Sequence, residues 1–200
     1  MNFFYPILVA FLFVFLSELG DKTQLLVLSF SAKQKAFTVL LGVALGSFFS
    51  HGVAILFGSS LGLIGNEQIE HLLHWITHLS FLLFGFFTLF RKEKEENSSN
   101  KKQNFLQKVA HSNLNYILVI GLSIAVGELG DKTFLASIGL GIQYPNVKLF
   151  LVIGAVLGMV VSDLLAIVFG KALSKKISES TMQKISGILF LLFGLIGIIG

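Results

Sequence analysis

The chain of 200 residues is 54% hydrophobic and only 13% charged, with a mean hydropathy of +0.82. Globular chains carry about 25% charged residues, so this composition excludes a water-soluble enzyme and predicts an integral membrane protein. The net charge of +4 is not gathered in a basic stripe with interleaved aromatics, so we expect no nucleic-acid partner. The chain has no cysteine, so any metal must be held by oxygen or imidazole.

Six apolar segments follow one another along the chain, most of them near or above the roughly 18 residues that cross a bilayer. In chain order they are 4–30, 37–57, 72–90, 116–140, 149–169 and 185–200. Each is expected to be an α-helix, because unpaired backbone groups cannot face lipid and no period-two strand pattern is present. The first should be a retained span and not a signal peptide, since no Lys or Arg precedes Lys22. The predicted fold class is an all-α membrane protein with six transmembrane helices.

The basic residues predict how the chain crosses the membrane. If the amino terminus lies outside, the connections on the inner side hold twelve of the 15 Lys and Arg, and the outer connections hold only Lys148. The positive-inside rule therefore places the amino terminus outside and the charged linker, 91–108, in the cytoplasm.

An internal repeat divides the chain into two halves. The sequence SELGDKT at 17–23 recurs as GELGDKT at 127–133, and FLLFG at 81–85 recurs at 190–194. Residues 1–90 and 109–200 are thus expected to be two copies of a three-helix unit. Three is odd, so the second copy enters the membrane from the opposite side. Inverted repeats of this kind are typical of secondary transporters, whose site lies near the membrane midplane between the halves.

Two acids and one lysine interrupt each copy of the first helix. They are Glu18, Asp21 and Lys22 in the first half, and Glu128, Asp131 and Lys132 in the second. Each charge at the bilayer centre costs about 2.5–3.5 kcal/mol on insertion scales, which favours a functional site over a packing device. If the helix is continuous, the three side chains share one face. Alternatively, Gly20 and Gly130 open the helix and expose carbonyl oxygens as further ligands.

Together the two motifs predict a cation site. Four carboxylates, with the hydroxyls of Thr23 and Thr133 beside them, suit a hard ion such as Mg²⁺, Ca²⁺ or Mn²⁺. Against two lysines they leave a charge of −2, which matches a divalent ion. Crowded carboxylates cannot all stay ionised once the ion leaves, so exchange of cation for protons is the hypothesis. The lysines either neutralise the empty site or take part in gating or proton transfer.

Further polar residues flank this site in the second and fifth segments. Asp163, next to Ser162, is expected to be a fifth ligand or a proton carrier, whereas His51, next to Ser50, is expected to be a packing residue. Any ligand role of Gln24 would be one-sided, because the repeat has Phe at the matching position.

Two other patterns are expected to be structural. The Gly-x-x-x-Gly pairs that begin at Gly42 and Gly154 predict close helix packing. A stripe of Glu67, His71, His74 and His78 enters the third segment from the outer side. We interpret this stripe, which Trp75 accompanies, as a membrane-interface feature and not as a metal site.

The doubled pattern Glu-x-Gly-Asp-Lys-Thr resembles the motif of the Gdt family of cation/proton exchangers. This family includes the Golgi manganese and calcium transporter of eukaryotes and bacterial manganese exporters. The resemblance implies export of Mn²⁺ or Ca²⁺ in exchange for H⁺, with the acidic motif residues as ligands and no permanently bound cofactor. The short linker resembles that of bacterial members, which favours manganese export across the plasma membrane. The choice between Mn²⁺ and Ca²⁺ and the oligomeric state stay open.

Two other transport functions remain as alternatives, a passive divalent-cation channel and an exporter of a small amino acid. An enzyme is not expected, because the pattern Glu-x-Gly-Asp-Lys-Thr holds neither a Ser or Cys nucleophile nor a His.

Overall fold

The computed structural model describes residues 4–19, 21–32, 34–64, 67–90, 116–176 and 179–199, and these residues form helices and turns without any strand. The elements are α1 (Phe4–Glu18), α2 (Lys22–Ser31), α3 (Ala36–Gly62), α4 (Glu67–Phe90), α6 (Tyr116–Glu128), α7 (Lys132–Gln143), the short 3₁₀ helix η1 (Pro145–Val147), α8 (Lys148–Lys176) and α9 (Glu179–Ile199). The predicted linker 91–108 lies outside the described residues. The expected all-helical architecture is confirmed for the described part of the chain.

The surface of the helices is apolar, as a lipid environment requires. Helix α3 and the stretch Pro145–Val168 are long and apolar enough to cross a membrane, and shorter apolar helices accompany them. Phe48, Phe49 and Phe57 of α3 are each more than half exposed. Contiguous apolar surface of this kind is rare on soluble monomers and suits contact with lipid tails.

The first and fourth predicted spans are each broken in the middle. This corrects the expectation of single helices over 4–30 and 116–140 and agrees with the alternative in which the helix opens within each motif. Helix α1 ends at Glu18 before α2 starts, and α6 ends at Glu128 before α7 starts. Gly130 has a φ of +78°, a conformation that side-chain-bearing residues rarely adopt. Gly20, at the matching position, lies outside the described residues.

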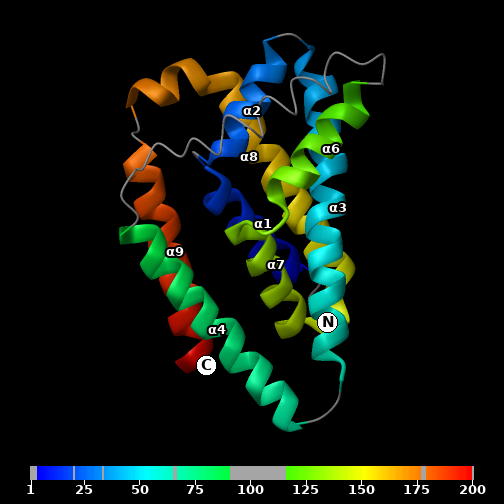
Figure 1. Cartoon of the computed structure of the whole chain (residues 1–200), viewed down its shortest axis with the longest axis vertical. Helices are drawn as coiled ribbons and strands as arrows, with labels where there is room; N and C mark the ends of the chain where they lie inside the picture. The colour runs from blue at the N-terminus through cyan, green and yellow to red at the C-terminus, as the bar shows by residue number, and fades with distance from the viewer. Residues whose placement is uncertain are drawn as a thin grey trace.

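The two halves of the chain exchange helices (Figure 1). Helix α1 packs along α8, α6 packs along α3, and α4 pairs with α9. Small residues allow the backbones to approach closely: a Cβ atom at Gly158 would lie 2.6 Å from the carbonyl oxygen of Phe11 on α1. Gly42 meets Ile120 of α6 in the same way. The predicted close packing of the glycine pairs is confirmed.

Both chain ends lie at one end of the bundle, which also carries the ends of α3 and α7 and which we call the terminal end (Figure 1). The last helix, α9, begins earlier in the sequence than predicted. It begins at Glu179, not at residue 185, and is 21 residues long. The prediction was wrong because Glu, Met, Gln and Lys are polar or mixed in hydropathy but good helix formers, so hydropathy marks the apolar part and not the helix start.

Candidate cation site

The site is built at the two helix breaks, which adopt the same local structure in both halves. The backbone N–H of Asp21 donates to the carbonyl oxygen of Glu18 at 3.1 Å, and that of Asp131 donates to Glu128 at 3.0 Å. Asp21 has φ −76° and ψ 163°, and Asp131 has φ −78° and ψ 168°. Each aspartate thus directly precedes the first residue of a new helix, while each glutamate closes the helix before it.

Three acids of the two motifs converge. Glu18 and Glu128 are completely buried, and with Asp131 they offer carboxylate oxygens that all lie within 4.8 Å of one another. Oε1 of both glutamates and Oδ2 of Asp131 have no hydrogen-bond partner. Buried carboxylate oxygens without a partner are costly, so this cluster requires a cation or protons.

The two threonines orient the glutamates. Oγ1 of Thr23 donates to Oε2 of Glu18 at 3.2 Å, and Oγ1 of Thr133 donates to Oε2 of Glu128 at 2.9 Å. In each pair the other carboxylate oxygen, Oε1, is the one left without a partner. The hydroxyls therefore hold each carboxylate so that one oxygen stays available to an ion.

The fourth acid of the motifs has a different partner. Asp21 accepts a hydrogen bond from Nζ of Lys132 at 3.1 Å, in an ion pair whose side chains are 21% and 20% exposed. This pair joins the motif of one half to that of the other. The side chain of Lys22 lies outside the described residues.

Helix α8 adds a fifth acid. Asp163 is completely buried, and neither of its carboxylate oxygens has a hydrogen-bond partner. The adjacent Ser162 accepts a hydrogen bond from Nε2 of Gln24, 2.7 Å to its Oγ and 3.3 Å to its carbonyl oxygen. Gln24 thus ties α2 to α8, and the acid that follows Ser162 stays unpaired.

Helix α3 presents a different arrangement at the matching position. Nδ1 of His51 lies 2.8 Å from Oγ of Ser137 on α7, and Ser50 donates to the carbonyl oxygen of Ser47 at 3.4 Å within α3. The contact of Ser137 with His51 was not predicted from the sequence, because the matching position of the first half is Val27 and no motif contains Ser137. His51 therefore has a protein partner, which is compatible with a packing role and does not test a functional one.

The sequence is similar to known proteins over most of its length. The family model described as "Divalent cation/proton antiporter GDT1" matches residues 6–96 and 116–200. The chain is 27% identical to a Vibrio cholerae protein named "Putative manganese exporter", over 91% of this chain and 84% of that protein. It is 26% identical to the GDT1-like protein sll0615 of Synechocystis, over 92% of each chain.

A plant protein is similar as well: the chain is 29% identical to the chloroplastic protein PAM71 of Arabidopsis thaliana, over 92% of this chain and 54% of that protein. No solved structure matches the chain. Since the family model covers both halves and both acidic motifs, the sequence resemblance is confirmed, and the chain belongs to the GDT1 family of divalent cation/proton antiporters.

Proposed function

We propose that this protein exports Mn²⁺ across the plasma membrane of a bacterium in exchange for protons. The observation that carries the proposal is the group of three carboxylates formed by the buried Glu18 and Glu128 and the half-buried Asp131, which offer oxygens within 4.8 Å of one another. Each of the three has one carboxylate oxygen without a hydrogen-bond partner. Oxygen ligands in this number suit Mn²⁺ or Ca²⁺. The name of the Vibrio cholerae relative favours manganese as the cargo.

The architecture we propose is six spans in two inverted repeats, with the helix breaks near the midplane. The exchanged packing supports it, since α1 on α8 and α6 on α3 are equivalent pairs under the sequence repeat. The distribution of Lys and Arg supports an amino terminus outside and a linker in the cytoplasm. The terminal end of the bundle is then the outer end.

Proton coupling follows from the charge of the site. Cation binding requires ionised carboxylates, and the same carboxylates cannot stay ionised together in a buried site without the cation. Asp163, buried and unpaired on α8, is the group we assign to proton transfer. A divalent ion and protons thus compete for one set of oxygens, which is the basis of exchange.

Alternating access is supported by how the pair of α4 and α9 contacts the rest of the bundle. Within the described residues, α4 contacts α7 and α9 contacts α1 more extensively than either contacts α2 or α6. Under the repeat, α1 corresponds to α6 and α7 to α2. We infer that this structure is the state closed at the outer end. In the opposite state, α9 would contact α2 and α4 would contact α6, which would close the inner end.

Manganese flux into proteoliposomes, with and without an imposed pH gradient, tests the exchange. We expect gradient-driven flux of Mn²⁺ with the wild type and a loss of at least tenfold in Glu128→Gln, because the site loses one of its three charges. Glu93→Gln removes the same charge from the predicted linker and serves as the control. Flux that persists unchanged without the gradient would favour the passive channel, and flux of an amino acid in its place would favour the other alternative.

Cysteine cross-linking tests alternating access. Because the chain has no cysteine of its own, only the introduced pair can form a disulfide. A Cβ atom at Gly139 of α7 would lie 2.7 Å from Cγ2 of Thr77 on α4. We expect the pair Thr77→Cys and Gly139→Cys to cross-link on oxidation and to stop exchange until it is reduced. The repeat-equivalent pair, Ser29→Cys and Ser186→Cys, should cross-link only in the opposite state. Undiminished exchange with the first cross-link in place would contradict this mechanism.

A further inference from the structure

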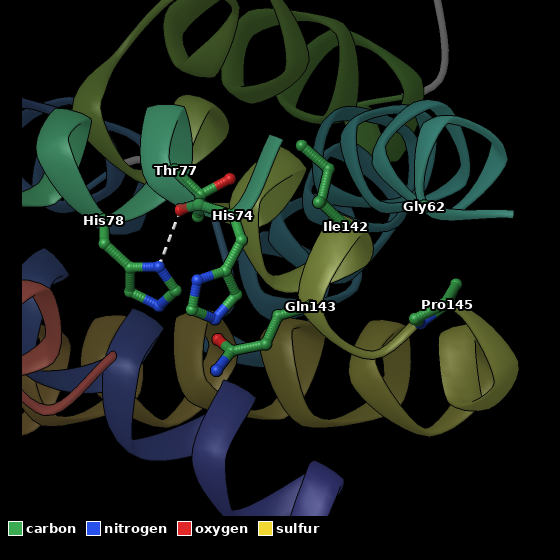
Figure 2. A pocket seen from close by; sticks show the side chains of 7 residues that line it. All are labelled: Gly62, His74, Thr77, His78, Ile142, Gln143 and Pro145. Carbon is green, nitrogen blue, oxygen red and sulfur yellow. Dashed lines mark hydrogen bonds between the residues drawn. The ribbon is translucent and has the colours of Figure 1, made fainter. Parts of the chain in front are cut away.

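A second group of metal-ligating side chains lines a cavity at the terminal end of the bundle. The cavity has a volume of about 230 Å³ and lies between α4, the end of α3 and the end of α7. His74, Thr77 and His78 of α4 face it, together with Gln143 of α7. Figure 2 shows the two imidazole rings side by side, with the amide of Gln143 close to the ring of His74. None of these residues belongs to the acidic motifs.

The hydrogen bonding of His78 leaves one ring nitrogen available to a ligand. Nδ1 of His78 lies 2.7 Å from the backbone carbonyl oxygen of His74, and a carbonyl oxygen only accepts, so Nδ1 carries the hydrogen. In the neutral ring, Nε2 then has a free lone pair. Metal-binding histidines commonly donate their other N–H to a backbone carbonyl in this way. His78 is 1% exposed, and its ring centroid lies 4.0 Å from that of His74, so both rings are held together.

Thr77 provides an independent sign that the cavity takes a polar ligand. Its side chain is 5% exposed, and Oγ1 has no hydrogen-bond partner although it lines the cavity. A buried hydroxyl without a partner costs free energy, which a bound ion or its water would recover.

The structure also divides the histidine stripe that the sequence shows. His71 lies on the exposed face of α4, where its Nε2 accepts a hydrogen bond from Nε1 of Trp75 at 3.3 Å. His74, which is also exposed, and the buried His78 both line the cavity. The interface interpretation therefore suits His71, and the other two histidines need a different one.

We propose that His74 and His78 chelate one divalent transition-metal ion that prefers imidazole, such as Ni²⁺ or Zn²⁺, with the amide oxygen of Gln143 and water completing the coordination. Two histidines four residues apart on a helix present both rings to one ion, as in the zinc motif His-Glu-x-x-His. Here Trp75 stands in place of the glutamate, so the site binds metal without the base that hydrolysis needs.

The nitrogen ligands distinguish this site from the acidic one. Imidazole favours Ni²⁺ and Zn²⁺ over Ca²⁺ and Mn²⁺, whereas carboxylates suit the latter pair. The cavity of about 230 Å³ has room for the ion and for water as further ligands. With Gln143 as a ligand, the bound ion connects α4 to α7.

Calorimetric titration of the purified full-length protein with NiCl₂ tests the proposal. We expect His78→Ala to bind one Ni²⁺ fewer than the wild type and His74→Ala to bind that ion at least tenfold more weakly. Gln143→Ala should weaken it by a smaller factor. His71→Ala, an exposed histidine on the same helix, is the matched control and should bind as the wild type does. Ni²⁺ should raise the melting temperature of the wild type and of His71→Ala, but not that of His78→Ala.

Unchanged Ni²⁺ binding in both His74→Ala and His78→Ala would overturn the proposal, as would an equal loss in His71→Ala. His74 is exposed, so its replacement leaves the core intact even if the buried His78 cannot be replaced without unfolding. The helical circular dichroism and the melting temperature of each variant without added metal report correct folding. None of these readouts uses transport, so the result does not depend on the proposed exchange of manganese for protons.

Discussion

Replacement of Lys132 by alanine tests whether the lysine competes with the cation for the acidic site. Nζ of Lys132 lies 3.1 Å from Oδ1 of Asp21, so at an effective dielectric constant of about 20 their attraction is about 5 kcal/mol. Removal of both charges from water offsets most of this gain. A net attraction of about 1–3 kcal/mol between Lys132 and Asp21 corresponds to a change of roughly 5- to 150-fold in the affinity for the cation.

We therefore expect Lys132→Ala to bind Mn²⁺ at least fivefold more tightly, because Asp21 no longer has a competing partner. Slower release should then lower the maximal rate of export while the cation concentration at half-maximal rate falls. Calorimetry gives the dissociation constant and proteoliposome flux gives the two kinetic parameters. Lys148→Ala, an exposed lysine at the start of α8, controls for the loss of one positive charge. Weaker Mn²⁺ binding in Lys132→Ala would refute the competition and show that the lysine instead keeps the site assembled.

Three further predictions concern packing, proton transfer and pH. Gly158→Ala should lower stability by about 1–3 kcal/mol in thermal unfolding, because its Cβ would meet the carbonyl oxygen of Phe11 at 2.6 Å; Gly52→Ala, with no atom within 4 Å, should not destabilise the protein. Asp163→Asn should bind Mn²⁺ within about twofold of the wild type yet lose at least tenfold of the pH-driven flux, and normal flux would remove Asp163 from the proton path. Burial raises the pKa of Tyr144 to about 12, so absorbance titration should show a tyrosine that ionises there and is missing in Tyr144→Phe. Because the folded protein favours the neutral phenol, its contribution to stability should fall as pH rises above the ordinary pKa of about 10.

The acidic motifs could be found from the sequence because membrane insertion makes their charges expensive. Charges in apolar segments and a repeat of seven residues are visible without coordinates, and so is the glycine spacing that predicts close packing at Gly42. The distances could not be predicted, because they depend on how four helices cross. The sequence treats Asp21 and Asp131 as equivalent, yet Asp21 pairs with Lys132 while Asp131 lies with the glutamates.

The helix breaks and the cavity at the terminal end were harder to predict for a similar reason. A glycine within an apolar segment is compatible with a continuous helix, and the break is shown by the backbone, namely the extended Asp21 and Asp131 and the φ of +78° at Gly130. The histidine stripe has helical spacing throughout. Which of its members turn toward α7 depends on the angle between two helices that hydropathy does not encode, so His71 and His78 look alike in the sequence.

The differences between the halves suit the proposed use of one duplicated site by a cation and by protons. The glutamates and threonines are matched in both halves, so the repeat provides this set of proposed cation ligands in each half. Beside them the halves diverge: His51 contacts the hydroxyl of Ser137, whereas the equivalent of Ser137 is Val27, which has no group to donate to Asp163. A carboxylate without a donor in a buried position holds a proton more easily than a charge. The repeat thus supplies the proposed cation ligands in both halves, and the absence of a hydroxyl at Val27 leaves the proposed proton carrier in one half alone.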